Sequence, residues 1–157
     1  MKYESVKIND FSVYGITAEL TTSQTENSKI ISRHWRKFNR HLRNKNLWQG
    51  KGWVKYGITK KVEDKYFYMA AIESNVTIAS LEIDTINTGE FIRFQHVGSL
   101  ERIKLTISDI YRNVIPVQGI KINSNRALVH YERYDYRFNW NDQNSIIDIY
   151  VPVDNRK

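Results

Sequence analysis

The order of secondary-structure signals occurs twice along this chain, at a spacing of roughly 75 to 80 residues. In the first half, residues 11–20 (FSVYGITAEL) have the β-branched and aromatic content of a strand. Residues 53–61 (WVKYGITKK) and 66–73 (YFYMAAIE) are predicted to be two more strands. Between the first and second strands, apolar residues recur at the spacing of an amphipathic helix: Ile31, Trp35, Phe38 and Leu42. The first half therefore has the order strand, helix, strand, strand.

The second half has the same order. Residues 90–97 (EFIRFQHV) are a predicted strand, and Ser99 precedes a predicted helix that Pro116 ends. The apolar stripe of that helix consists of five residues: Ile103, Ile107, Ile110, Tyr111 and Val114. Residues 127–138 (ALVHYERYDYRF) and 145–153 (SIIDIYVPV) are predicted to be the last two strands. Polar turns are expected at QGKG (49–52) and NWNDQN (139–144).

This duplication predicts a single α+β domain over residues 1–157, made of two β-α-β-β modules at about 8–75 and about 88–155. The modules are expected to be related by a pseudo-twofold axis and to share one antiparallel sheet, with the helices on one face. Because pockets tend to form where modules meet, a binding site is expected between the two halves.

The composition excludes several classes of protein. The absence of cysteine rules out disulfides, thiol nucleophiles and zinc–thiolate sites. The first residues, MKYESVKINDF, have no apolar run and do not resemble a signal peptide. No segment approaches the roughly twenty apolar residues that cross a bilayer. Together these features predict a cytoplasmic protein that does not associate with a membrane.

The net charge of +7 is unevenly distributed. Residues 29–61 contain 11 Lys and Arg and no Asp or Glu, so the remainder has 24 − 11 = 13 basic against 17 acidic residues. A basic helix with Trp and Phe among its cations could bind nucleic acid or an anionic protein, or it could be a solvated face. Since no recognised nucleic-acid motif accompanies it, direct DNA binding is not expected.

Glu132 stands in the middle of the strand-like segment LVHYERYDYRF (128–138). A buried, unpaired carboxylate loses several kcal/mol of hydration, which a bound organic cation would offset. Aromatic faces would add about 1–2 kcal/mol each. The alternative is an exposed glutamate paired with Arg133, Arg137 or His130.

Five segments, taken in order, resemble the GyrI-like effector-binding family, which includes the drug-binding domains of AraC- and MerR-type regulators: ISRHWRKF, VKYGIT, FQHVGS, HYERYD and DIYVPV. The resemblance covers nearly the whole chain. It implies an aromatic pocket between the modules with Glu132, of the Tyr131-Glu132 pair, at its floor. The predicted ligand-binding residues are Glu132, Trp35, Tyr56, Tyr68, Tyr134 and Phe38. Tyr66 and Phe67 compete with Tyr68 for its position.

What the resemblance implies is a standalone small-molecule effector-binding protein, related to transcription regulators or able to sequester drugs. Its ligand would be lipophilic and cationic or planar and aromatic. No residues before Phe11 are left for a helix-turn-helix. One alternative is a hydrolase of strained electrophiles, in which Glu132 activates water and Tyr56 or Tyr68 donates a proton. Another is an interaction protein that uses the basic helix.

Catalytic, metal and cofactor signals are weak. Asp148 could work with Glu132 as a second carboxylate, or it could be an outward-facing acid. The histidines show no ligand spacing, and a metal or haem site would require them to converge in space: His34, His41, His96 and His130. We therefore predict no metal and no cofactor.

Overall fold

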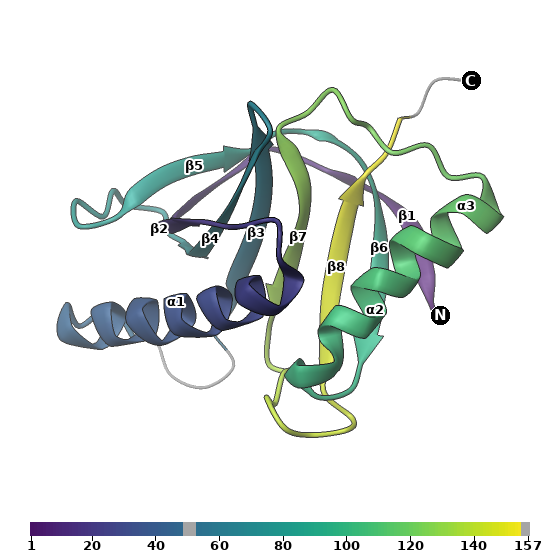
Figure 1. The fold of residues 1–157 in the computed structure, drawn as a ribbon. Coiled ribbons are helices and arrows are strands. Elements are labelled where there is room, and N and C mark those ends of the chain that lie inside the picture. The colour runs from purple at the N-terminus through teal and green to yellow at the C-terminus, as the bar shows by residue number, and fades with distance from the viewer. Residues whose placement is uncertain (49–52, 155–157) are drawn as a thin grey trace.

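Eight antiparallel strands form one curled sheet, and the helices pack against one of its faces (Figure 1). The computed structural model describes residues 1–48 and 53–154, so the turn expected at QGKG lies outside the described residues. The strands are β1 (Tyr3–Ile8), β2 (Phe11–Glu19), β3 (Lys55–Val62), β4 (Lys65–Glu73), β5 (Glu82–Ile86), β6 (Gly89–Val97), β7 (Leu128–Tyr134) and β8 (Ile146–Pro152). The predicted α+β fold with a shared antiparallel sheet is confirmed.

The strand order is β1-β6-β8-β7-β3-β4-β2-β5, which has the same pattern from either end. The central strands β3 and β7 pair with each other, and β4 and β8 flank them. Then come β2 and β6, and finally β5 and β1. This order is that of a pseudo-twofold pair of modules whose symmetry axis passes between β3 and β7.

The edge strands β1 and β5 were not predicted, and the structure shows that the two halves exchange them. β1 leads into β2 but pairs with β6, whereas β5 leads into β6 but pairs with β2. The two connections meet: the backbone N–H of Asp10 donates to Thr88 Oγ1 at 3.0 Å, and the N–H of Thr88 donates to Asp10 Oδ1. This exchange ties each module to the other at the ends of the sheet.

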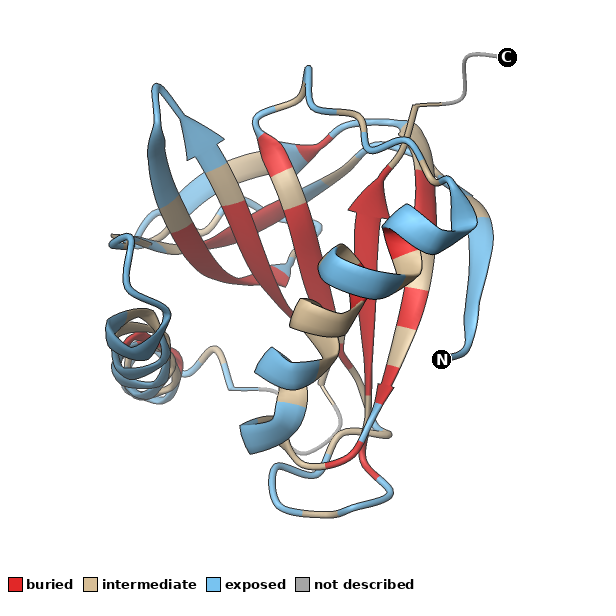
Figure 2. Ribbon diagram, turned by 45° about the vertical axis from the view of Figure 1, so that its right-hand side comes forward, coloured by how far each residue is buried: buried red, intermediate tan, exposed pale blue. Residues whose placement is uncertain are grey.

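Helix α1 (Gln24–Asn44) begins where the polar segment after β2 supplies a cap. The Ser23 side chain accepts a hydrogen bond from the Glu26 N–H at 3.2 Å, which satisfies one of the unpaired donors at the helix start. Phe38 and Leu42 are fully buried against the sheet. Figure 2 shows that the opposite side of this helix is exposed.

The second helix is continuous but irregular: a 3₁₀ turn (Leu100–Arg102), α2 (Ile103–Asp109), a π-helical turn (Ile110–Val114) and α3 (Ile115–Gln118). The prediction that Pro116 ends it is wrong. The widened turn before Pro116 makes room for its ring and its missing N–H, so the helix reaches Gln118. Gly119 then ends it in the left-handed conformation, with φ 64°. Among the described residues, no helix is both long and apolar enough to cross a membrane.

The sheet has two differently packed faces. The outer face carries the helices, with α1 over β2 and β4 and the second helix over β6 and β8. The inner face curls on itself around aromatic rings, including Tyr131 and Tyr150, which stack with centroids 4.6 Å apart. Because alternate residues of a strand point to opposite faces, neighbouring side chains of β3 and β7 face the helices and the inner face in turn.

Candidate functional site

A pocket of about 570 Å³ opens on the outer face, where α1, the start of β3 and the loop after β7 converge. Its wall is mainly aromatic, and all four tryptophans of the chain contribute to it. The lining residues are Trp35, Asn39, Trp48, Trp53, Lys55, Leu100, Tyr134, Asp135, Phe138, Asn139 and Trp140. These residues come from both modules, as expected for a site between the halves.

The inner wall of the pocket is a packed set of rings. Trp35, from α1, lies edge-on to Tyr134 at the end of β7, with centroids 5.6 Å apart. Tyr134 in turn contacts Phe138 with centroids 5.0 Å apart. Trp35 also packs on Phe38, which is fully buried and supports it from the core side. The wall is therefore core on its far side and pocket on its near side.

Glu132 lies directly behind this wall and is only 6% exposed. Its Oε1 accepts two hydrogen bonds, from the Tyr134 hydroxyl at 2.6 Å and from the Tyr68 hydroxyl at 3.0 Å. The Tyr68 hydroxyl accepts one from Trp35 Nε1 at 2.9 Å. A hydrogen-bonded chain thus runs from the pocket wall, through Tyr68, to a buried carboxylate.

Gly57 makes this arrangement possible. It pairs with Glu132 of β7 on one side and with Ala70 of β4 on the other. A Cβ at this position would be 2.0 Å from the Tyr68 hydroxyl and 2.6 Å from Glu132 Oε1. The absent side chain leaves the space in which the tyrosine reaches the carboxylate.

Burial dominates the electrostatics of this cluster. It raises the pKa of Glu132, and the hydrogen bonds from Tyr134 and Tyr68 oppose that rise only in part. Burial, followed by the nearby Glu132 charge, raises the pKa of both tyrosines well above their usual value. Glu132 forms no ion pair with any described residue, so its charge lacks a permanent counter-ion within the part of the chain that the structure describes.

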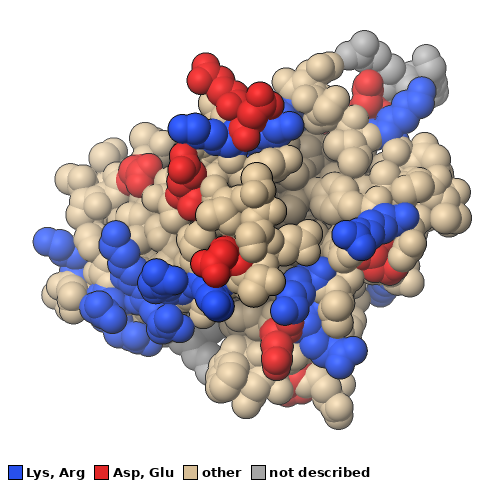
Figure 3. All heavy atoms as spheres, in the orientation of Figure 1, with Lys and Arg blue, Asp and Glu red and all other residues tan. Residues whose placement is uncertain are grey.

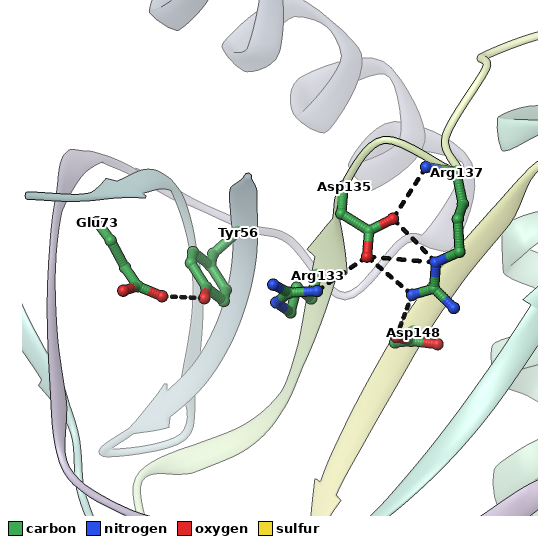
Figure 4. Close-up of polar contacts among 6 residues, drawn as sticks. All are labelled: Tyr56, Glu73, Arg133, Asp135, Arg137 and Asp148. Atoms are coloured by element: carbon green, nitrogen blue, oxygen red, sulfur yellow. Dashed lines mark hydrogen bonds and ion pairs between the residues drawn. The ribbon is translucent and has the colours of Figure 1, made fainter. Parts of the chain in front are cut away.

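Arg133 and Arg137, expected as alternative partners of Glu132, pair with Asp135 instead, each at 2.9 Å (Figure 4). Arg137 also reaches Asp148 on β8 at 2.5 Å. Figure 4 shows this guanidinium bridging the two carboxylates at the start of the loop after β7. The bridge holds in place the loop that supplies Phe138 and Trp140 to the pocket.

The structure does not bring Asp148 next to Glu132. Asp148 is only 4% exposed, but it is paired in register with Arg133, whereas Glu132 is paired with Ile149. The two carboxylates therefore point to opposite faces of the sheet. They are not arranged to share general acid and base work.

Of the predicted ligand-binding residues, Trp35, Tyr68, Tyr134 and Glu132 come together in one cluster. Tyr68, rather than Tyr66 or Phe67, holds the position that contacts Glu132. Phe38 lies behind Trp35 in the core. Tyr56 is on the inner face of the sheet, where its hydroxyl donates to Glu73 (Figure 4).

Sequence reasoning missed most of the outer wall of the pocket. Trp53 and Lys55 lie in the segment predicted to be a strand, Trp140 lies in the predicted turn NWNDQN, and no role was predicted for Trp48. A usable signal was present: these tryptophans stand within or next to segments otherwise rich in polar residues and glycine, where bulky apolar side chains have no core to fill. Large aromatic residues in such places indicate a binding surface.

The histidines are dispersed and engaged in separate contacts. His34 Nε2 lies 2.7 Å from the Ile16 carbonyl oxygen, and His130 Nδ1 lies 2.8 Å from the Tyr111 hydroxyl. His96 contacts Thr106, and His41 contacts Ser80. The described residues contain no group of three or more potential ligands that could hold a metal ion.

The basic helix exposes a straight row of cations, which we call the basic stripe: Lys29, Arg33, Arg36, Arg40 and Arg43. Their spacing of four and three residues places them along one side of α1. Figure 3 shows Lys and Arg atoms gathered over this helix. Lys29 has a neighbouring acid, Glu26, at 3.8 Å.

Comparison with known families settles the relationship that the sequence suggested. Residues 5–153 match the model of Cass2, the integron-associated effector-binding protein. The chain belongs to the Cass2 family. No curated protein matches the sequence. The aromatic pocket and its buried carboxylate are therefore features of a member of the Cass2 family.

Solved structures show the same fold. SAV2435 bound to tetraphenylphosphonium has a TM-score of 0.77 and 17% identity, over 99% of this chain and 95% of that chain. An integron cassette protein from the mobile metagenome of Vibrio cholerae has a TM-score of 0.66 and 17% identity, over 97% and 95%. The EcmrR C-terminal domain has a TM-score of 0.58 and 12% identity, over 98% and 97%. The GyrI-like fold that the sequence resemblance implied is confirmed, and the family match identifies this chain as an effector-binding protein of the Cass2 type.

Proposed function

We propose that the protein binds a lipophilic, aromatic and cationic small molecule in the tryptophan-lined pocket, as the effector of a regulatory or drug-sequestering system. The observation that carries this proposal is the convergence of all four tryptophans on one cavity backed by a buried carboxylate without an ion-pair partner among the described residues. The volume of about 570 Å³ is in the range of pockets for drug-sized ligands.

The chemistry of the wall favours cations with aromatic groups. Each tryptophan face attracts a cation by about 0.5–2 kcal/mol, and tryptophan does so more strongly than other aromatic side chains; it also stacks on planar rings. Glu132 supplies negative charge from behind Tyr134, in surroundings where water does not screen it well. SAV2435, which shares the fold, was solved with tetraphenylphosphonium, so this ion is a suitable first probe.

Binding to the pocket should depend on Trp140, which is 66% exposed on the loop after β7. Trp140→Ala is expected to weaken tetraphenylphosphonium binding about tenfold, since it removes one aromatic wall. Titration followed by tryptophan emission measures this directly, because every tryptophan of the chain lines the pocket.

The matched control is Tyr136→Ala. Tyr136 is on the same loop and is 80% exposed, but it does not line the pocket. Its removal should leave the affinity unchanged. Equal losses in both variants would mean that the loop, and not the aromatic wall, governs binding, and no response of the wild-type emission to the ion would remove the proposal.

A second candidate function is contact with an acidic protein surface through the basic stripe on α1. It is favoured by the exposed row of cations and by the absence of acidic residues from 29 to 61. Polyglutamate is the model partner. Its binding is expected to weaken several-fold between about 0.05 and about 0.2 M salt and in the Arg36→Glu, Arg40→Glu double variant. Failure to bind, or stronger binding to duplex DNA, would argue against an acidic protein as the partner.

A further inference from the structure

Lys55 is the one feature of the pocket that the proposed function does not explain. It belongs to β3, where it is paired in register with Tyr134 and Ile72, and its side chain lines the cavity. Its Nζ lies 4.0 Å from the centroid of the Trp48 ring and donates to Asn39 Oδ1 at 2.9 Å. The ammonium therefore already occupies a position on an aromatic face that suits a cation.

The charged groups around Lys55 do not neutralise it. Arg43, from α1, lies 4.5 Å from the centroid of the same Trp48 ring, and its positive charge repels the Lys55 ammonium. Asp135, from the loop after β7, is engaged by Arg133 and Arg137. Glu132, from β7, is covered by Tyr134 and Tyr68. Lys55 has no ion-pair partner among the described residues.

We propose that Lys55 determines the charge selectivity of the pocket. Its ammonium already occupies the face of Trp48, so a cationic ligand must either displace it or bind when Lys55 is deprotonated. This inference rests on the proposed function. It means that a proton on Lys55 and a cationic ligand compete for the same aromatic surface. A lipophilic anion, by contrast, would gain an ion pair with the same group.

The competition falls in an accessible pH range. Burial, and then the repulsion from Arg43, lowers the pKa of Lys55 to about 8. If only the deprotonated form accepts the cation, the competent fraction rises about tenfold between about pH 7 and about pH 9, and the apparent affinity rises with it. Asp135 stays ionised and Tyr134 stays protonated over this interval, because the pKa of Asp135 is lowered by its arginines despite burial and that of Tyr134 is raised well above 10. Glu132, whose pKa burial raises, is the remaining group to control.

The test uses two ions of the same shape and opposite charge, tetraphenylphosphonium and tetraphenylborate, titrated in sodium buffers with tryptophan emission as the readout. For the wild-type protein, the phosphonium affinity is expected to rise about tenfold from about pH 7 to about pH 9, and the borate affinity to fall. Lys55→Met, which keeps an unbranched stem, should bind the phosphonium about tenfold more tightly than wild type at about pH 7, with a flat profile.

Two further variants separate Lys55 from its neighbours. Lys55→Arg keeps the charge but does not titrate, so it should bind the phosphonium weakly at both pH values. Glu132→Gln should have a lower affinity but the same rise with pH. If Lys55→Met and wild type show the same pH profile, or if Glu132→Gln abolishes the rise, the inference is wrong while the binding function stands. If neither ion binds to any of these proteins, the proposed function fails as well.

Discussion

Glu132→Gln is expected to lower the affinity for tetraphenylphosphonium about tenfold while making the folded protein more stable at neutral pH. The loss of affinity follows from removing the negative charge behind Tyr134, since tenfold corresponds to about 1.4 kcal/mol. The gain in stability follows because the amide has nearly the same shape and no charge to desolvate. Its oxygen can still accept from both tyrosine hydroxyls, which donate to the same oxygen in the wild-type protein.

The effect on stability should depend on pH, with a definite sign. Because the pKa of Glu132 is raised above its usual value of 4.5, the folded state holds the proton more tightly than the unfolded state. The wild-type protein therefore loses stability as pH rises from about 4.5 through the pKa of the folded state. Denaturant unfolding at about pH 4 and about pH 7 should show the advantage of Glu132→Gln mainly at the higher pH.

Glu101→Gln is the control, since Glu101 is exposed at the start of the second helix. It removes one negative charge without touching the pocket and should change neither affinity nor the pH dependence of stability. A stability difference between Glu132→Gln and wild type that is the same at both pH values would show that desolvation of the carboxylate is not its cause. An unchanged affinity would mean that its charge plays no part in binding.

Gly57→Ala is expected to destabilise the protein by about 1–3 kcal/mol and to abolish ligand binding. The new methyl group would meet the Tyr68 hydroxyl at 2.0 Å and Glu132 Oε1 at 2.6 Å. Tyr68 is fully buried, so its ring cannot move without disturbing Trp35 and the pocket wall. Urea unfolding measures the first effect, and tryptophan emission in the presence of tetraphenylphosphonium measures the second.

Gly89→Ala provides the comparison for this strand glycine. A Cβ at Gly89 would also come within 2.6 Å of another group, but that group is the guanidinium end of Arg126, a long, half-buried side chain whose tip can shift more easily than the buried ring of Tyr68. Gly89→Ala should therefore have a small effect on stability and none on binding. If the two variants were equally stable, the close approach at Gly57 would not be a constraint on the site.

The sequence predicted the strands and helices that contribute large apolar side chains. It did not predict the elements whose structure depends only on packing or on pairing with another strand. The helix marked by Trp35, Phe38 and Leu42 forms because those residues must be buried on one side. Strands β1 (YESVKI) and β5 (EIDTI) carry many charges and are mostly exposed, so no hydrophobic pattern identifies them. They exist as strands because the curled sheet offers β6 and β2 as partners.

The site shows a similar division. The resemblance to GyrI-like proteins located Glu132, Trp35 and Tyr68, but strand register decided which neighbours face them. Tyr56 and Gly57 are adjacent in β3, and the structure turns the glycine, not the tyrosine, toward Glu132. Lys55 enters the pocket for the same reason of alternation. The aromatic residues outside the strands were missed because they come together only when α1, the start of β3 and the loop after β7 converge on one pocket.

The most direct test of the binding site is a crystal structure of the protein grown with tetraphenylphosphonium. The expected result is the ion within the pocket, with its phenyl rings against Trp35, Trp53 and Trp140 and its charge toward the wall that covers Glu132. An ion bound on the inner face of the sheet or at the surface, with the tryptophan pocket unchanged, would contradict the account.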